Sequence, residues 1–168
     1  HVLVAGTQKD FFFEDNGIKF YGFAQRRTFL FTWFTYRKFL NRQINFLVAK
    51  ENIQVIEAPD WTGLTAFMRF KVPLVIRFHG SDTYFCHLEK RPQKWKNRWF
   101  ETLAVQKAAA CIAPTRLAGD LSAKLLKVNE KKVTTLHHGL RLEDFINPFP
   151  LQYDQAKILY IGTLIRKK

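Results

Sequence analysis

An apolar run that ends in side chains able to bind a ligand is the first chemical feature of this sequence. Residues 72–82 read VPLVIRFHGSD, so the run closes on His79, Gly80 and Asp82. In open parallel sheets, ligands bind beyond the carboxyl ends of the strands, and Gly80 would let a ligand approach the backbone because it has no Cβ. The residues therefore indicate a site centred on His79. The alternative is that His79 caps the sheet and Gly80 only turns the chain.

A second polar group follows another apolar segment. The stretch EAPDW places Glu57, Asp60 and Trp61 close together, which brings two carboxylates beside one aromatic ring. Aspartate is also a favoured first residue of helices, so the alternative is that Asp60 caps a helix. The two roles are compatible.

The segments that must position these groups alternate between strand and helix patterns. Several apolar segments are rich in Val, Ile and Leu with little alternation, which is typical of parallel strands covered on both faces. We expect strands at residues 1–6, 18–23, 53–58, 74–79, 110–114, 132–137 and 157–162. We expect helices at residues 28–50, 61–70, 93–109 and 116–126. This order predicts an α/β fold in which right-handed crossovers build one parallel sheet.

Local signals support this order and divide the chain. Asn16-Gly17 is a turn signal, and Thr115 is a suitable first residue for the helix that follows it. Prolines at 148 and 150 indicate a linker. We therefore expect one domain at residues 1–150 and the truncated start of a second at 151–168. Because the sequence opens inside a strand pattern without Met, we interpret it as a fragment.

Composition narrows the classes of partner. The 27 Lys and Arg residues outnumber the 14 Asp and Glu residues, giving a net charge of +13. Such an excess favours nucleic acid, nucleotide, phospholipid or phosphorylated glycan as partner. No apolar stretch approaches the roughly 20 residues of a spanning helix. Two cysteines, Cys86 and Cys111, form no disulfide framework and favour a reduced compartment.

Several enzyme classes lose support because their motifs are absent. The sequence shows no glycine-rich phosphate loop, no zinc-type spacing of His and Cys, and no nucleophile elbow. Hydrolases and metalloenzymes are therefore disfavoured, and no metal site is expected.

Four segments in one order resemble a known family. They are PLVIRFHG at 73–80, CIAPT at 111–115, LHHGLRLEDF at 136–145 and ILYIGTLIRKK at 158–168. Together they resemble glycosyltransferase family 4, the glycogen-synthase-like enzymes with the GT-B fold, over nearly the whole chain. The resemblance implies a two-domain retaining glycosyltransferase. Its N-terminal Rossmann-like domain, a parallel sheet flanked by helices, binds the acceptor, and its C-terminal domain binds a nucleotide-sugar without a catalytic metal or other cofactor.

The resemblance also implies roles for individual residues. His79 matches the catalytic histidine that lines the cleft beside the donor sugar, with Gly80 on the donor side. Lys168 falls where the family has a lysine for the donor diphosphate, and a cation beside phosphate suits the departing charge. Thr163 replaces the arginine usual in that motif, which weakens the phosphate clamp.

The resemblance also implies which residues face the acceptor. Glu57, Asp60, Trp61 and Asp82 would face the acceptor, because carboxylates suit sugar hydroxyls and an aromatic ring suits the face of a sugar ring. The implied acceptor is a glycan or a lipid-linked saccharide, as in cell-envelope polysaccharide synthesis.

Two departures from the family pattern affect activity. The glycine-rich loop is missing, because residues 1–6 align with the family's second strand. The donor-domain carboxylates are also absent. We therefore expect this polypeptide to be inactive alone.

Aromatic residues interleaved with cations suggest a further partner. Phe31, Phe39 and Phe46 fall outside the expected core stripe of helix 28–50, and residues 88–100 combine Trp95 and Trp99 with five cations. This pattern resembles interfacial membrane helices and favours a cytoplasmic protein at the inner face of a membrane. The alternatives are that the protein covers these phenylalanines, that residues 88–100 form a solvated helix face, or that the chain is a nucleic-acid-binding module without catalysis. No RNA-binding signature supports the last, and no specific nucleic acid is expected.

Overall fold

A computed structural model describes residues 1–26, 32–141 and 143 of the chain. The strands are β1 (Val2–Thr7), β2 (Phe11–Asp15), β3 (Ile18–Ala24), β4 (Ile56–Pro59), β5 (Leu74–Arg77), β6 (Ala110–Ala113) and β7 (Val133–Thr135). The helices are α1 (Thr32–Lys50), α2 (Asp82–Leu88), α3 (Trp95–Lys107) and α4 (Arg116–Leu126), with short 3-10 turns η1 (Trp61–Gly63) and η2 (Glu130–Lys132).

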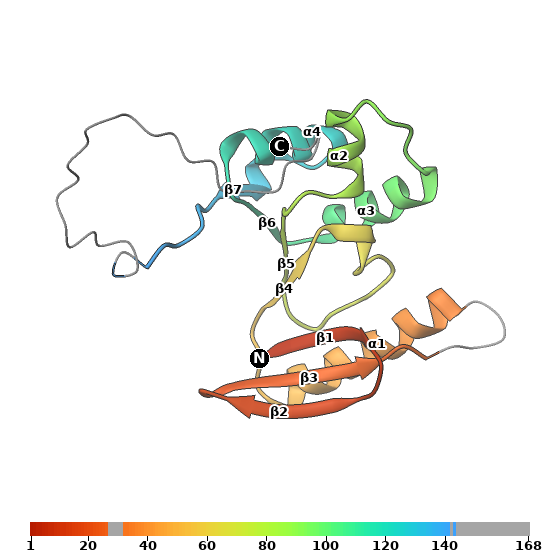
Figure 1. Cartoon of the computed structure of the whole chain (residues 1–168), viewed down its shortest axis with the longest axis vertical. Coiled ribbons are helices and arrows are strands. Elements are labelled where there is room, and N and C mark those ends of the chain that lie inside the picture. The colour runs from red at the N-terminus through yellow and green to blue at the C-terminus, as the bar shows by residue number, and fades with distance from the viewer. Residues whose placement is uncertain (27–31, 142, 144–168) are drawn as a thin grey trace, which may run out of the picture.

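The predicted α/β class is confirmed. Strands β4-β5-β6-β7 form a four-stranded sheet in that order, and every neighbouring pair is parallel. Helices α3 and α4 connect consecutive strands of this sheet, as the alternating pattern predicts (Figure 1). The fold is therefore a Rossmann-like parallel sheet flanked by helices.

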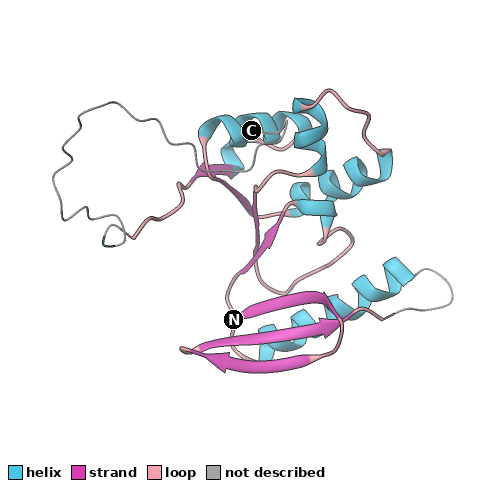
Figure 2. Ribbon diagram, viewed as in Figure 1, coloured by secondary structure: helices cyan, strands magenta, loops and turns pink. Residues whose placement is uncertain are grey.

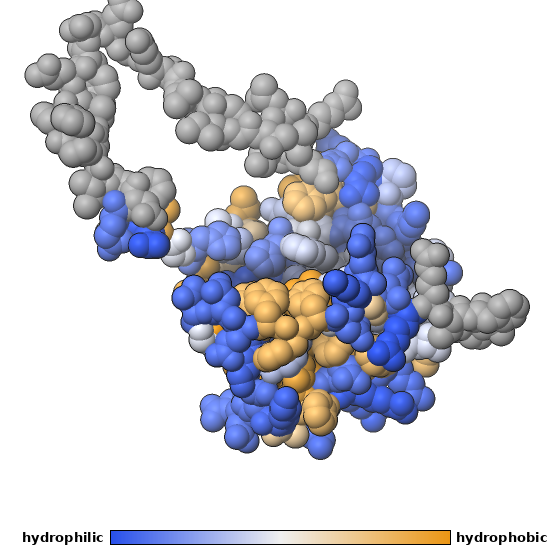
Figure 3. Space-filling view, turned by 60° about the horizontal axis from the view of Figure 1, so that its bottom comes forward, coloured by the Kyte–Doolittle hydropathy of each residue, from blue (hydrophilic) through white to orange (hydrophobic). Residues whose placement is uncertain are grey.

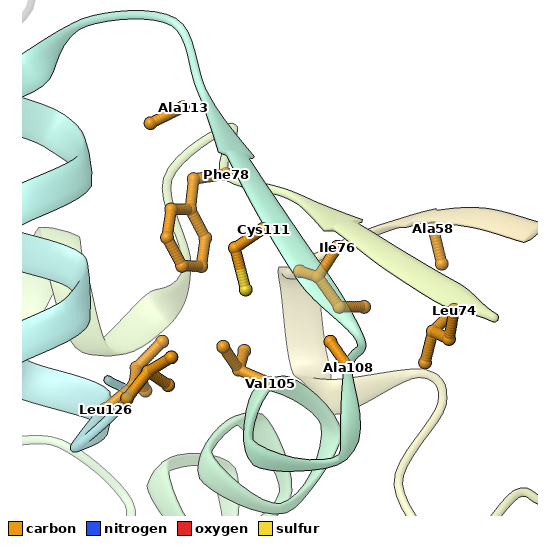
Figure 4. Packing of buried hydrophobic residues seen from close by; sticks show 10 residues of the cluster. Ala58, Leu74, Ile76, Phe78, Val105, Ala108, Cys111, Ala113 and Leu126 are labelled. Atoms are coloured by element: carbon orange, nitrogen blue, oxygen red, sulfur yellow. The ribbon is translucent and has the colours of Figure 1, made fainter. Parts of the chain in front are cut away.

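The core lies between this sheet and its helices. Figure 4 shows Phe78, Cys111 and Ile76 of the sheet region pointing toward Val105 of α3 and Leu126 of α4. Burial alternates along β5 and β6, so the described helices cover one face of the sheet more fully than the other. Burial on both faces, which the apolar runs predicted, is therefore only partly seen in the described residues.

The remaining strands form a separate sheet, which corrects the expected single one. In this three-stranded sheet, β1 is parallel to β3 and β2 is antiparallel to β3. The sequence did not predict β2. Its hairpin with β3 turns at Asn16-Gly17, where both residues have positive φ, 48° and 76°, as two-residue hairpin turns require. The turn signal was therefore correct, but the strand before it was missed.

One face of this sheet is covered by α1 and the other is open (Figure 2). The Tyr36 hydroxyl of α1 accepts a hydrogen bond from the Gly6 N–H at 2.7 Å and donates one to the Phe23 carbonyl at 2.9 Å. Apolar side chains gather on the outer face in the middle of Figure 3. Exposed apolar residues of these strands include Val2, Val4, Phe13 and Ile18.

Helix α1 also holds the segment that follows β4. The Asn41 Oδ1 atom accepts from the Arg69 N–H at 2.9 Å. The Asn45 side chain donates to the Arg69 carbonyl at 2.8 Å and accepts from the Lys71 N–H at 3.1 Å. These contacts join α1 to the main chain of the segment that leads into β5.

Arg37 makes a further contact between α1 and this segment. Its guanidinium donates to the Gly63 carbonyl at 3.0 Å and lies over the Trp33 ring, 3.7 Å from the centroid. Burial lowers the pKa of Arg37 to about 10, so the side chain stays protonated at neutral pH.

The helix predicted at 61–70 is wrong, because only η1 forms there. Thr62, Gly63 and Phe67 have positive φ, which breaks a helix. A Cβ on Gly63 would collide with the Phe100 backbone, so this glycine lets the segment pack closely against α3. Tertiary contacts override the helical pattern.

The other boundaries agree more closely. Thr115 caps α4 as predicted, since its hydroxyl accepts from the Ala118 N–H at 3.1 Å. The helix expected at 93–109 is α3, and the sequence did not predict α2. In the helix expected at 28–50 the described part begins at Thr32, and the strand expected at 157–162 lies outside the described residues.

Candidate functional site

The carboxyl ends of the parallel strands meet at one edge and present three aromatic side chains. Trp61 follows β4, His79 follows β5 and His138 follows β7. The His79 ring centroid lies 5.8 Å from that of Trp61 and 6.5 Å from that of His138, and the two imidazoles are nearly parallel at 16°. All three side chains are exposed. The edge thus offers ring faces and imidazole nitrogens to a ligand.

A buried carboxylate fixes the backbone of His79. Asp60 is completely buried, and its Oδ1 atom accepts a hydrogen bond from the His79 N–H at 3.1 Å. Its Oδ2 atom has no hydrogen-bond partner within the described chain. Burial raises the pKa of Asp60, because the charged form is poorly solvated there. Asp60 therefore positions His79 from below.

Gly80 is required by the turn after His79. Its φ is +109°, a conformation that other residues rarely adopt, and a Cβ would lie 2.5 Å from the Phe85 ring. The next residue, Ser81, accepts from the Tyr84 N–H at 3.1 Å and so caps α2. The turn and the cap together set the direction in which the chain leaves the site.

Glu101 of α3 supports the same turn, and the sequence did not single it out. Its completely buried carboxylate accepts from the N–H groups of Asp82 and Thr83, both at 3.0 Å. It also accepts from the Thr83 hydroxyl at 2.5 Å. The sequence signal that could have identified Glu101 is a glutamate on the buried side of the predicted helix.

Glu57 forms an ion pair at this edge. Its two oxygens accept from the Nε and Nη2 atoms of Arg77 at 2.7 and 2.9 Å. The Arg77 hydrogen bond holds the pKa of Glu57 below its usual value. The Glu57 side chain is 48% exposed, so its carboxylate stays accessible beside the salt bridge.

Asp82 faces α3 and the loop before it. Its carboxylate accepts from Arg91 at 2.8 Å and from Asn97 at 3.1 Å. Burial alone would raise the pKa of Asp82, but the hydrogen bonds from Asn97 and Arg91 outweigh that effect and lower it. Its hydrogen-bonding capacity is therefore largely used within the protein.

One comparison with known proteins decides the family. The model of Glycosyltransferase Family 4 matches residues 1–144, most of the chain. The chain belongs to Glycosyltransferase Family 4. No curated protein and no solved structure matches it. Membership in family 4 makes the chain a glycosyltransferase-family domain, which implies a sugar donor and an acceptor as partners in general.

The structure brings together only some of the site residues that the resemblance to family 4 led us to expect. The edge brings together His79, Gly80 and Trp61, whereas Asp60 lies beneath it and Asp82 turns toward α3. His138 also stands beside His79. Thr163 and Lys168 lie outside the described residues. The ligand roles of all these residues stay predictions.

Features outside the edge complete the picture of this family 4 domain. Both cysteines are free thiols. Among the residues that the structure describes, no three His, Cys, Asp or Glu side chains come together in a group that could hold a metal ion. In the same residues, every helix is too short or too polar to cross a membrane.

Proposed function

We propose that residues 1–150 form the acceptor-side domain of a retaining glycosyltransferase whose donor-binding domain begins at residue 151. The enzyme moves a hexose from a nucleotide-diphosphate sugar to a glycan or lipid-linked acceptor, as in cell-envelope polysaccharide synthesis. It uses no catalytic metal. We expect residues 1–168 to be inactive by themselves, because the chemistry needs groups from both domains.

The position of His79 carries the proposal. Its imidazole is exposed at the strand edge where open parallel sheets bind ligands, and the buried Asp60 fixes its backbone. A backbone held in place before the ligand arrives fixes the point from which the imidazole projects and so reduces reorganisation on binding. In the proposed complex the imidazole contacts the donor sugar as the catalytic residue, and Gly80 lies on the donor side of the imidazole.

The acceptor would lie on the Trp61 side of His79. The Trp61 ring is 53% exposed and can stack on the face of a sugar, while the accessible oxygens of Glu57 can accept hydrogen bonds from hydroxyls. Asp60 contributes by holding the turn, and Asp82 by fixing the start of α2. On the donor side, Lys168 and Thr163 would meet the diphosphate.

The test uses the full-length gene product with a panel of nucleotide-sugars and lipid or glycan acceptors. We expect sugar transfer with retained anomeric configuration, and a loss of about 100-fold or more in kcat/KM on His79→Ala. His87→Ala, at another exposed histidine, is the matched control and should leave activity unchanged. Product of inverted configuration, or full activity of the His79 variant, would contradict the proposal.

An aromatic and basic surface supports a peripheral position at the inner face of the cytoplasmic membrane. Trp33 stacks on Phe100 at 4.3 Å between ring centroids, Phe67 meets Trp99 at 5.5 Å, and Trp95 lies 6.3 Å from Trp99. Trp95 and Trp99 are 68% and 47% exposed. The exposed cations Lys94, Lys96 and Arg98 lie at or just before the start of α3.

These residues suit an anionic lipid surface, because tryptophan prefers the interface and cations attract lipid headgroups. The sequence had also included Phe31, Phe39 and Phe46 in the membrane face. Phe39 instead packs edge-on against Phe23 of the sheet, 5.8 Å between centroids, and Phe31 lies outside the described residues. Phe46 is exposed, as expected.

Flotation with vesicles containing phosphatidylglycerol tests this membrane proposal. We expect binding that Trp95→Ser with Trp99→Ser reduces at least tenfold, whereas the control Phe12→Ser, at an exposed phenylalanine of β2, leaves it unchanged. Equal loss of vesicle binding in both variants would contradict the assigned membrane face, and tight oligonucleotide binding without vesicle binding would favour the nucleic-acid alternative.

A further inference from the structure

A cavity of about 390 Å³ lies at the end of the parallel sheet that is opposite to His79. Leu74, the first residue of β5, and Ala109, just before β6, both line this cavity. Figure 4 shows Leu74 at the start of β5 and Phe78, which directly precedes His79, beyond its other end. The cavity is therefore remote from the edge that carries the proposed sugar site. We call this space the basal cavity.

The interior of the basal cavity is apolar. Met68 and Leu74 are almost completely buried, at 4% and 7% exposed. The single uncharged polar side chain in the lining is Thr65, which is also buried. The remaining apolar residues of the lining are Phe70, Val72, Pro73 and Ala109. Since small-molecule sites usually measure about 300–1,000 Å³, the cavity is large enough for an apolar ligand body.

The rim of the basal cavity carries two cations without a counter-ion in the described chain. Arg69 and Lys107 line the cavity, are exposed to solvent and take part in none of the salt bridges among the described residues. By contrast, Arg77 and Arg91 pair with carboxylates. A guanidinium can donate two parallel hydrogen bonds to a carboxylate, and an ammonium group adds to the attraction. The rim therefore suits the anionic group of a ligand.

The main chain around the cavity favours a carboxylate over a phosphate. Side chains of α1 accept hydrogen bonds from the N–H groups of Arg69 and Lys71 at 2.9 and 3.1 Å. The Leu74 carbonyl accepts from the Ala109 N–H at 2.8 Å, and Pro73 has no N–H. Phosphate sites commonly use several free main-chain N–H groups, which these positions do not supply. The same bonds fix the lining before a ligand binds and leave the Arg69 side chain free to meet it.

We propose that the basal cavity binds a medium-chain fatty acid. The carboxylate would lie at Arg69 and Lys107, and the hydrocarbon chain would pack against Met68 and Leu74. Burial of the chain supplies the attraction, and the two cations select the anion. The net charge of +13 favours the approach of an anion. The site is independent of the proposed sugar transfer, and its distance from His79 allows both ligands to be bound at once.

Isothermal titration calorimetry of the full-length protein with sodium octanoate tests the proposal. We expect saturable binding of one octanoate per chain. Octanol has the same chain without the charge, and acetate has the charge without the chain, so each should bind at least tenfold more weakly. Inorganic phosphate should not displace octanoate. Equal binding of octanol would show a site without anion recognition, and displacement by phosphate would show a simple anion site; either result would overturn the proposal.

Charge substitutions locate the carboxylate. We expect Arg69→Gln and Lys107→Gln each to weaken octanoate binding at least fivefold. Both residues are exposed, so the variants should fold, and circular dichroism checks this. Lys124→Gln removes an exposed cation of α4 that does not line the cavity and should leave binding within twofold. Equal effects of all three substitutions would mean that only the overall charge attracts octanoate, which would overturn the proposal.

Substitutions of small side chains locate the hydrocarbon chain. Ala109 is exposed at the cavity, so Ala109→Trp should block it and weaken octanoate binding at least tenfold. Ala49→Trp, at an exposed alanine of α1 outside the cavity, is the matched control and should leave binding unchanged. Thr65→Val keeps the shape of the interior and should also leave binding within twofold. Loss of binding in the Thr65 variant, or full binding in the Ala109 variant, would overturn the proposal. Because no readout depends on sugar transfer, the proposal fails separately from the proposed function.

Discussion

Asp60 and His79 are joined by a hydrogen bond from the His79 backbone N–H to the Asp60 carboxylate, 3.1 Å long. The Asp60 side chain is completely buried, whereas the His79 side chain is exposed at the strand edge. Asp60 is the N-cap residue of η1, yet its side chain makes no capping bond to that turn. The carboxylate instead links the end of β4 to the end of β5, which makes the histidine position a property of the core.

Removal of the Asp60 carboxylate should destabilise the protein. Asp60→Ala leaves the His79 N–H without its acceptor and opens a small cavity, so we expect a loss of about 1–3 kcal/mol in the free energy of unfolding. Urea denaturation measures it. Asp120→Ala, at an exposed aspartate, is the control. Equal stability of the two variants would show that the hydrogen bond does not hold the turn.

The same residue predicts a pH dependence. Burial raises the pKa of Asp60 above its unfolded value of about 3.9, so the folded protein binds this proton more tightly than the unfolded chain. The resulting stabilisation is present below the unfolded pKa and is lost as pH rises through the folded pKa.

Asp60→Asn keeps an acceptor for the His79 N–H but cannot ionise. We therefore expect the stability of this variant relative to the native protein to increase as pH rises from 4 toward neutrality. Denaturation curves at several pH values measure the difference, and a difference that stays constant with pH would contradict the assignment.

Gly80 should not tolerate a side chain. With φ at +109° and the Phe85 ring close by, Gly80→Ala forces strain or movement that should cost about 1–3 kcal/mol. The control is Gly139→Ala, because nothing lies within 4 Å of a Cβ built there. Differential scanning calorimetry compares the two, and we expect a lower Tm for the Gly80 variant alone.

Glu101 should be sensitive even to an isosteric change. Glu101→Gln replaces one acceptor oxygen by an N–H donor that faces the donors of Asp82 and Thr83. We expect a loss of about 2–3 kcal/mol in the free energy of unfolding, because a buried donor is left unpaired. Glu130→Gln, on an exposed residue, should be neutral. A neutral Glu101 variant would mean that the start of α2 does not depend on this carboxylate.

Substitution of Glu57 can distinguish a structural role of this side chain from a role in ligand binding. Because its side chain is half exposed, its ion pair with Arg77 should contribute less than about 1 kcal/mol to stability. Glu57→Gln should therefore unfold at nearly the native urea concentration. If Glu57 binds the acceptor as proposed, the same variant of the full-length protein should raise the KM for acceptor and leave the KM for donor unchanged.

The sequence predicted the parallel sheet and the strand exit at His79, because both depend on local signals. Apolar runs of strand length and the glycine after His79 are visible without tertiary information. The predicted helix at 61–70 failed because its path is set by Gly63 against Phe100 and by hydrogen bonds from α1, contacts distant in sequence.

Local sequence signals also could not predict the directions in which the acidic side chains point. Asp60 and Asp82 look alike in sequence, as carboxylates near strand exits. Only packing shows that one lies under His79 and the other binds Arg91 and Asn97. The division into two sheets likewise depends on which edges meet, and no residue pattern in β1 or β4 specifies that.

The contacts of Asn41 and Asn45 have an evolutionary consequence. The Asn41 amide binds the main chain of Arg69, and the Asn45 amide binds that of Arg69 and Lys71, whose own side chains are exposed. Since the backbone is the same for almost every amino acid, the fold leaves positions 69 and 71 free to vary among relatives. The two asparagines are constrained, because a change at either one would release that part of the chain whatever residues it carries.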